Sequence, residues 1–210
     1  MIAIIRFASL AAVAWKNGGG LTREYAVGPA GAGLDAFDWR VSAADVGKDG
    51  PFSRFDGVDR TLAVLDGDGL ELRFAHQTAW LSPTSDAFAF PGDVPAEARL
   101  TGGPIRDLNV MTRRAAWRHA VRRLTLRADE GVGLGGDVNL VVAEEPCALR
   151  IGDRREALAR GDAALTQDGP LSIAIESPSP TRIIVVALYE DAGGDRRVRD
   201  LPSARRRGEG

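Results

Sequence analysis

The chain has 210 residues, with 27 lysines and arginines against 29 aspartates and glutamates, a formal net charge of -2. This near-neutral balance excludes a strongly basic nucleic-acid-binding surface and provides no polybasic attraction to membranes. The 44% share of hydrophobic residues is enough to build the core of one large domain or two small ones.

The first segment, residues 2–7, is a short apolar stretch that we interpret as a strand. It has no basic start and no long hydrophobic region, so we expect no signal peptide. The longest apolar runs, such as residues 183–188, are far shorter than a membrane span. The single cysteine, Cys147, cannot form an internal disulfide and fits a reducing compartment. We therefore expect a cytoplasmic protein.

Residues 15–24, WKNGGGLTRE, hold three consecutive glycines directly after a tryptophan, a lysine and an asparagine. Glycine lets the backbone approach another group closely and adopt a positive φ. Lys16 would then supply a point charge, Asn17 an oriented amide, and the glycine N–H groups an anion-binding nest. Lys16 and Lys48 are the only two lysines in the chain, so the lysine in this motif stands out. A tight loop capped by Trp15 is the alternative interpretation.

The rest of the chain has a β pattern. Residues 37–43, FDWRVSA, alternate apolar and polar side chains. Phe37, Trp39 and Val41 therefore share one face of a strand, and Arg40 and Ser42 share the other. Further short runs predict strands at 23–27, 61–65, 70–74, 108–113, 117–126, 138–143, 171–176 and 182–189. No long stripe of apolar residues has the helical period, so the short strands indicate a sandwich or barrel.

The turns repeat in a rhythm that divides the chain into halves. A hairpin around the Asp-Gly turn at 66–69 is followed by Gly-Asp at 92–93 and a strand at 108–113. A hairpin at 141–149 is likewise followed by Gly-Asp at 161–162 and a strand at 182–189. This order is typical of the cupin, a small antiparallel jelly-roll barrel. We therefore predict an all-β tandem cupin, or bicupin, although Gly-Asp turns are common in any β protein.

The predicted domain boundaries follow from this repeat. We place an N-terminal barrel with a ligand pocket at residues 1–130, and a C-terminal barrel, completed by strands from the first half, at 131–190. The glycine-rich segment 131–136 has the wrong spacing for a dinucleotide fingerprint, so we interpret it as a flexible connection. Residues 191–210 form a charged tail without interleaved aromatic residues, which indicates a frayed terminus rather than a nucleic-acid-binding arm.

The chemistry of a metal-dependent cupin is missing. Such a site usually brings together two histidines one residue apart, a carboxylate and a third histidine. This chain has only His76 and His119, far apart in the sequence. It has no Gly-x-Ser-x-Gly elbow, and Cys147 follows a proline without a histidine nearby. We therefore expect no metal, no cofactor and no catalytic nucleophile.

A set of mostly cationic and amide side chains remains. It comprises Lys16, Asn17, Arg40, Ser42, Arg60, Asn109, Met111 and Arg113, the last three at alternate positions of one strand. Polar residues on the inner face of a barrel are costly to bury unless they meet a polar ligand. Lysine, arginine and amide donors together complement a carboxylate. For each residue taken alone, a solvated strand face is the alternative.

Several blocks in the first 115 residues resemble the HutD/Ves family. They are WKNGGGLTRE at 15–24, FDWRVSAADVGKDGPFSRF at 37–55, GVDRTL at 57–62, Gly-Pro at 103–104 and NVMTRR at 109–114. The resemblance implies a bicupin fold. It also implies binding of a metabolite of histidine utilisation, such as urocanate or formylglutamate, to limit the flux through that pathway. In one departure, Asp56 stands where the family often carries proline, which we interpret as loop variation.

Our leading hypothesis is a metal-free bicupin that binds a small carboxylate and regulates histidine utilisation. Lys16 and Arg40 would supply charge, and Glu24 would hold the Lys16 loop. Arg60 or Arg113 would provide a second cation. The full predicted ligand-binding set is Trp15, Lys16, Asn17, Glu24, Arg40, Ser42, Arg60, Asn109, Met111 and Arg113. The C-terminal barrel would be structural or form the surface of a homodimer.

Two other functions remain open. A metal-independent isomerase or hydrolase of a small acid would use Glu24, Asp38 or Asp107 as base, with Lys16 as electrophile or general acid. A protein-interaction module without a small ligand would have a cavity below about 100 Å³, because ligand sites usually measure several hundred. For all three functions we expect neither nucleic acid nor membrane as a partner.

Overall fold

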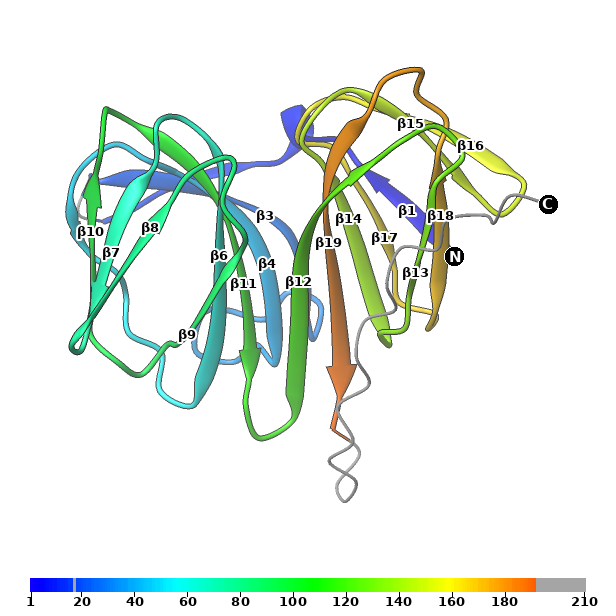
Figure 1. The fold of residues 1–210 in the computed structure, drawn as a ribbon. Coiled ribbons are helices and arrows are strands. Elements are labelled where there is room, and N and C mark those ends of the chain that lie inside the picture. The colour runs from blue at the N-terminus through cyan, green and yellow to red at the C-terminus, as the bar shows by residue number, and fades with distance from the viewer. Residues whose placement is uncertain (17, 192–210) are drawn as a thin grey trace. The chain divides into compact units, whose positions relative to one another are not determined.

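The computed structural model describes residues 1–16 and 18–191, which divide into two compact units. The first unit is Leu10–Arg118, and the second unit combines Met1–Ser9 with the chain from His119 onward. Each unit contains two sheets (Figure 1). Within the described residues the only helical element is one short 3-10 helix, η1 (Phe7–Ser9), so the prediction of an all-β chain is confirmed.

The first unit packs a six-stranded sheet against a four-stranded one (Figure 1). The larger sheet has the order β2 (Ala12–Ala14), β3 (Gly20–Gly28), β4 (Trp39–Val46), β11 (Ile105–Arg113), β6 (Val58–Asp66) and β9 (Phe88–Pro91). The smaller sheet has the order β5 (Gly50–Pro51), β10 (Ala96–Leu100), β7 (Leu70–Phe74) and β8 (Gln77–Leu81). Buried side chains from both sheets, including Leu62, Leu72 and Phe90, form one core cluster.

The second unit has the same two-sheet plan. One sheet has the order β1 (Ile2–Ile5), β17 (Ala163–Thr166), β14 (Val138–Ala143), β19 (Thr181–Glu190) and β12 (Trp117–Leu126). The other has the order β13 (Gly131–Leu134), β18 (Leu171–Ile175), β15 (Cys147–Ile151) and β16 (Arg154–Leu158). Its core is apolar, and Leu149, Ile175 and Ile183 are completely buried there.

The structure divides the chain differently from the predicted boundary at residue 130. Strand β12 belongs to the sheet of the second unit, and β1 joins the same sheet by pairing with β17. The interpretation of 131–136 as a flexible connection is wrong, because β13 pairs with β18 along its whole length. Val132 and Leu134 alternate with glycines and are buried, which is the period of a strand. Residues 192–210 of the predicted tail lie outside the described residues.

Strands β4, β11 and β6 of the larger sheet in the first unit are mostly buried on both faces. On one face of β4, Trp39, Val41 and Ala43 are at most 4% exposed. On the other face Ser42 is 1% exposed, so the polar side of the predicted alternation is not a solvated surface. Burial of such a polar face needs partners, since an unpaired buried polar group costs about 1–3 kcal/mol.

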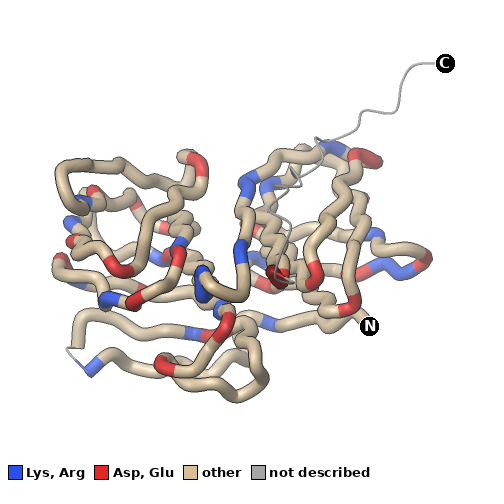
Figure 2. The backbone as a smooth tube through the Cα atoms, turned by 90° about the horizontal axis from the view of Figure 1, so that it is seen from below, with Lys and Arg blue, Asp and Glu red and all other residues tan. Residues whose placement is uncertain are grey.

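Charges are mixed over the surface of each unit. Figure 2 shows acidic and basic residues interspersed along both backbones, in agreement with the net charge of -2. No helix in the described part of the chain is long and apolar enough to cross a membrane.

Candidate functional site

A cavity of about 850 Å³ lies in the first unit. Eight of the ten predicted ligand-binding residues line it: Trp15, Lys16, Glu24, Arg40, Ser42, Arg60, Asn109 and Met111. They come from the β2–β3 turn and from strands β3, β4, β6 and β11, and Ala98 of β10 contributes from the facing sheet. Segments far apart in the sequence thus reach one cavity.

The glycine motif forms the turn between β2 and β3. The Trp15 backbone N–H donates to the Gly20 carbonyl at 2.9 Å, and the Gly18 N–H donates to the Trp15 carbonyl at 3.0 Å. Gly18 has a φ of +66°, and a Cβ on Gly20 would collide with the Asp45 carbonyl, so both positions need glycine. Because the turn itself uses the Gly18 N–H, this group does not serve the predicted anion nest. The turn fixes Trp15, whose indole N–H donates to Thr22 Oγ1 at 2.7 Å.

Lys16 lies at the exposed edge of the cavity, where Lys48, the other lysine, also contributes to the lining. Lys16 makes no ion pair with any residue in the described ranges 1–16 and 18–191. Asn17, predicted to orient the ligand, lies outside the described residues. The two lysines therefore place positive charge at the cavity mouth.

Arg40 is held inside the cavity by two neighbours on its own face of the sheet. Its Nε donates to Glu24 Oε2 at 2.7 Å, and its Nη1 donates to Ser42 Oγ at 3.1 Å. The sequence predicted that Glu24 holds the Lys16 loop. In the structure Glu24 binds Arg40 instead. The reason is register: Glu24 lies opposite Ser42, next to Arg40, whereas the Lys16 turn lies beyond Gly20, opposite Val46.

Arg60 is 3% exposed and lies among aromatic rings. Its guanidinium carbon is 5.0 Å from the Phe52 ring centre, 5.6 Å from Phe55 and 5.1 Å from Phe90. Its Nη1 donates to the Ser53 carbonyl at 3.0 Å, but its buried Nε has no hydrogen-bond partner in the described structure. Burial lowers the pKa of Arg60 to about 10, which still leaves it charged at neutral pH.

The two arginines, buried Arg60 and partly buried Arg40, flank one residue of the central strand. Met111 lies opposite Arg40 on one side and opposite Arg60 on the other. Neighbouring strands are about 4.8 Å apart, so the two arginine Cα atoms lie about 10 Å apart on the same face. The positive charge of Arg40 contributes to the lowered pKa of Arg60, after burial. Glu24 compensates part of the Arg40 charge, and the positive charge that remains on the pair makes the space over Met111 favourable for an anion.

Asp107 and Asn109 continue the same face of β11 away from the arginines. Both carboxylate oxygens of Asp107 and Asn109 Oδ1 are buried without a hydrogen-bond partner among the residues that the structure describes. Burial, with a smaller contribution from the negative charge of Asp45, raises the pKa of Asp107 to about 7. The charge of Arg60 and the Ala44 backbone amide act in the opposite direction. Three hydrogen-bond acceptors thus face the cavity unpaired.

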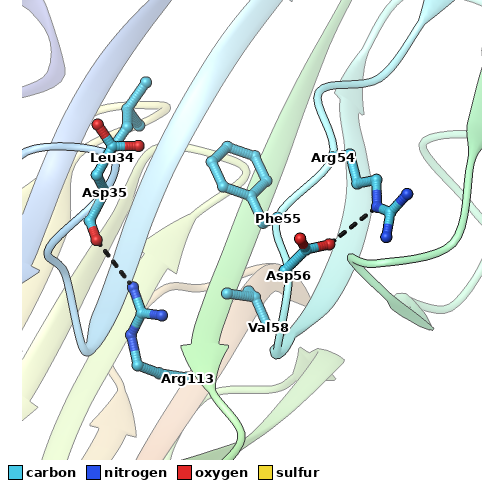
Figure 3. Close-up of a pocket in the computed structure, with 7 residues that line it drawn as sticks. All are labelled: Leu34, Asp35, Arg54, Phe55, Asp56, Val58 and Arg113. Carbon is cyan, nitrogen blue, oxygen red and sulfur yellow. Dashed lines mark hydrogen bonds and ion pairs between the residues drawn. The ribbon is translucent and has the colours of Figure 1, made fainter.

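Arg113 does not reach this cavity, in contrast to the prediction from its alternate position on β11. It lines a neighbouring pocket of about 450 Å³ with Leu34, Asp35, Arg54, Phe55, Asp56 and Val58, of which Leu34 and Phe55 also line the large cavity (Figure 3). Its Nε donates to the Phe37 carbonyl at 3.1 Å and its Nη2 to the Asp35 carbonyl at 3.2 Å. These bonds turn the side chain away at the strand end, beyond the buried cluster of Phe37, Val58 and Met111.

The structure adds lining residues that the predicted ligand set lacked. They include Lys48, Asp49, Phe52, Ser53, Phe55 and Asp107. Asp107, which the sequence analysis named only as a candidate base, shares the period-2 face of Asn109 and Met111, so it belonged in the predicted ligand set as well. The loop 48–55 could not be placed from the sequence. Asp38, considered as a base, precedes β4 and is absent from the cavity lining.

No three His, Cys, Asp or Glu side chains gather as metal ligands in the ranges 1–16 and 18–191. His76 lies in the turn after β7, and His119 lies on β12. The candidate site therefore consists of arginine, lysine, amide, carboxylate and aromatic groups.

Comparison with known proteins agrees with this architecture. A family model described as HutD matches residues 8–183. The chain belongs to the HutD family. Among curated relatives, Protein Ves from Citrobacter koseri is 32% identical over 165 residues, 78% of this chain and 82% of that protein. A 21.2 kDa protein in the hutC 3' region of Pseudomonas putida is 45% identical over 97 residues, 46% of this chain and only half of that protein.

Solved structures show the fold of this HutD-family chain. PA5104 from Pseudomonas aeruginosa PAO1 is 31% identical with a TM-score of 0.82, covering 90% of this chain and 99% of that one. HutD from Pseudomonas fluorescens SBW25 is 28% identical with a TM-score of 0.78, with the same coverage. YlbA from E. coli, at 10% identity and a TM-score of 0.70, shares the fold alone. The predicted bicupin fold is confirmed.

Proposed function

We propose that this HutD-family chain binds a small carboxylate metabolite in the cavity of the first unit. The observation that carries the proposal is a pair of arginines on either side of Met111: Arg60 is buried, and the Arg40 side chain is only 13% exposed. A carboxylate between them would offset their mutual repulsion and accept charge-assisted hydrogen bonds. The cavity volume of about 850 Å³ is ample for a metabolite.

The register of β3 and β4 determines whether Lys16 and the two arginines can contact the same carboxylate. The Lys16 turn lies beyond the Val46 end of β4, whereas Arg40 lies near the other end. Six strand residues separate these positions, which is about 20 Å of extended chain. A single carboxylate would therefore bind the arginine pair, and Lys16 would attract the acid at the mouth or bind a second anionic group.

The name of the family and the hutC-region relative support a role in histidine utilisation. In that role the protein would bind a pathway acid such as urocanate or formylglutamate in the cytoplasm and so regulate the pathway. Growth on histidine of a strain carrying only the Arg40→Ala variant tests this part. Growth identical to the wild-type strain would contradict it.

Isothermal titration calorimetry with urocanate, formylglutamate and glutamate tests binding directly. We expect at least one acid to bind the wild type at micromolar strength, about -8 kcal/mol. Arg40→Ala should weaken binding at least tenfold, and Lys16→Ala should weaken it less. Arg99→Ala, which removes an exposed charge outside the cavity, serves as the matched control. No heat from any of the three acids with the wild type would overturn the proposal.

A second candidate function, metal-independent catalysis on a small acid, is favoured by one observation. Asp107 lines the cavity with a pKa raised to about 7, which suits a general base at neutral pH. Glu24 suits this role less, because Arg40 binds it. Turnover of a bound acid, followed by NMR and lost in Asp107→Asn while binding persists, would support catalysis. The cavity volume of about 850 Å³ is well above the roughly 100 Å³ below which we expected a protein-interaction module without a small ligand.

A further inference from the structure

The cavity changes character along strand β11. At Met111 the neighbouring strands contribute the cations Arg40 and Arg60. At Asp107, four residues away, they contribute the apolar Ala44 and Val64. Four residues of strand correspond to about 13 Å. The two ends of one cavity face therefore offer different chemistry.

The end at Asp107 and Asn109 presents acceptors without donors. Asp107 is 1% exposed, and its Ala44 neighbour on β4 brings a backbone amide close enough to lower its pKa. Neither Asp107 oxygen nor Asn109 Oδ1 accepts a hydrogen bond of good geometry in the described structure. Arg60, the cation that acts on the pKa of Asp107, donates its Nη1 to the Ser53 carbonyl and leaves its Nε unpaired, so it donates to neither Asp107 nor Asn109. A buried acceptor left unpaired costs about 1–3 kcal/mol, so such groups normally have a partner. A ligand that carries only carboxylates would add further acceptors and leave these oxygens unpaired.

We propose that the cavity selects a bifunctional acid: its carboxylate lies between Arg40 and Arg60, and an N–H or O–H group at its other end donates to Asn109 Oδ1, about 7 Å along β11 from Met111, or to the Asp107 side chain beyond it. This assignment rests on the proposed function, because it concerns the same cavity. It defines the ligand class more narrowly, as an acid with an amide, imidazole or hydroxyl donor. Asp107 and Asn109 become the residues that discriminate among acids.

Matched probes separate this inference from carboxylate binding itself. N-acetyl-L-glutamate and (S)-2-acetoxyglutarate have the same charge and nearly the same shape, but the ester oxygen replaces the amide N–H. Urocanate and 3-(2-furyl)acrylate form a second pair, in which furan replaces imidazole. Titrations at pH 8 keep Asp107 ionised, above its pKa of about 7. The charged groups that act on it, Arg60 on β6 and Asp45 on β4, keep their charge at this pH.

In at least one pair, we expect the donor-bearing acid to bind the wild type about tenfold or more tightly than its partner. This preference should fall below about threefold in Asp107→Ala and persist in Arg99→Ala. Asn109→Ala provides a second variant if Asp107→Ala does not fold. Equal binding of both members of each pair by the wild type would overturn the inference while leaving carboxylate binding intact. Failure of every acid to bind would overturn the proposed function and the inference together.

Discussion

The Arg60 guanidinium lies 5.0 Å from the centre of the Phe52 ring, so the buried cation of β6 is held by the loop 48–55. Phe90 on β9 lies 5.1 Å away, and Phe55 lies 5.6 Å away. Cation–π contacts of this kind contribute about 0.5–2 kcal/mol each, depending on desolvation. The aromatic rings thus help to keep a charge buried at the cavity, where it can act on a ligand.

Replacement of Arg60 by methionine should separate its structural and binding roles. Arg60→Met removes the hydrogen bond to the Ser53 carbonyl and leaves Asp107 without its nearest cation, so we expect unfolding free energy to fall by about 3 kcal/mol. Urea denaturation measures this loss. The double variant Arg60→Met with Asp107→Leu should recover most of the stability but bind no acid, since an apolar replacement removes the unpaired carboxylate. A single variant as stable as the wild type would contradict this account of the pair.

Arg113 should matter for stability and not for the ligand. Its two hydrogen bonds to the carbonyls of Asp35 and Phe37 are lost in Arg113→Ala, so we expect the unfolding free energy to fall by about 1–3 kcal/mol. Acid affinity measured by calorimetry should stay within twofold of wild type, because the side chain is outside the large cavity. A tenfold loss of affinity would show that the small pocket belongs to the binding site.

The glycine motif gives a test of backbone geometry. In Gly20→Ala the new Cβ would collide with the Asp45 carbonyl and meet the Trp15 ring at 3.2 Å. We expect a loss of unfolding free energy of about 2 kcal/mol or more, typical of overpacking against fixed atoms. Gly33→Ala is the matched control, because no atom lies within 4 Å of a Cβ there. Equal thermal unfolding midpoints for the two variants would refute the steric role of Gly20.

The fold was largely predictable because strands have a short, local signature. The alternation of Trp39, Arg40, Val41 and Ser42 identified β4, and the apolar runs identified the other long central strands. Strand β13 was missed because glycine has low strand propensity, and its partner β18 lies forty residues away. The sequence predicted that strands from the first half complete the second barrel, but it could not identify them as β1 and β12, because these join their sheet through pairings with strands distant in sequence.

The site residues that could be predicted are those that lie at alternate positions of a strand. Arg40, Ser42, Asn109 and Met111 line the cavity because alternate positions share a face. The alternation of side chains along β11 wrongly predicted that Arg113 lines the cavity. The strand ends at Arg113, and its side chain donates to a nearby backbone carbonyl instead. No local pattern could show that the loop 48–55 folds over the cavity, because that contact depends on the packing of Phe52 against the core.

Asp107 should make stability depend on pH in a direction opposite to most carboxylates. Its pKa in the folded protein is raised by burial to about 7, from about 3.9 in an unfolded chain. Between these values the folded state binds the extra proton, so its contribution is fully present below about pH 4 and is lost as pH rises through 7. One pKa unit is worth about 1.4 kcal/mol, so the loss should be roughly 2–4 kcal/mol.

The comparison with Asp107→Asn isolates this contribution. Asp45, whose pKa is lowered because hydrogen bonds from Arg106 and Arg23 outweigh its desolvation, acts in the opposite direction in both proteins and cancels in the difference. Urea denaturation of wild type and variant at intervals from pH 4.5 to 8 gives the two unfolding free energies. We expect the wild type to lose stability relative to the variant as pH rises. A difference that stays constant across this range would show that Asp107 is ionised in the folded protein throughout, with water or a neighbour supplying the missing donors.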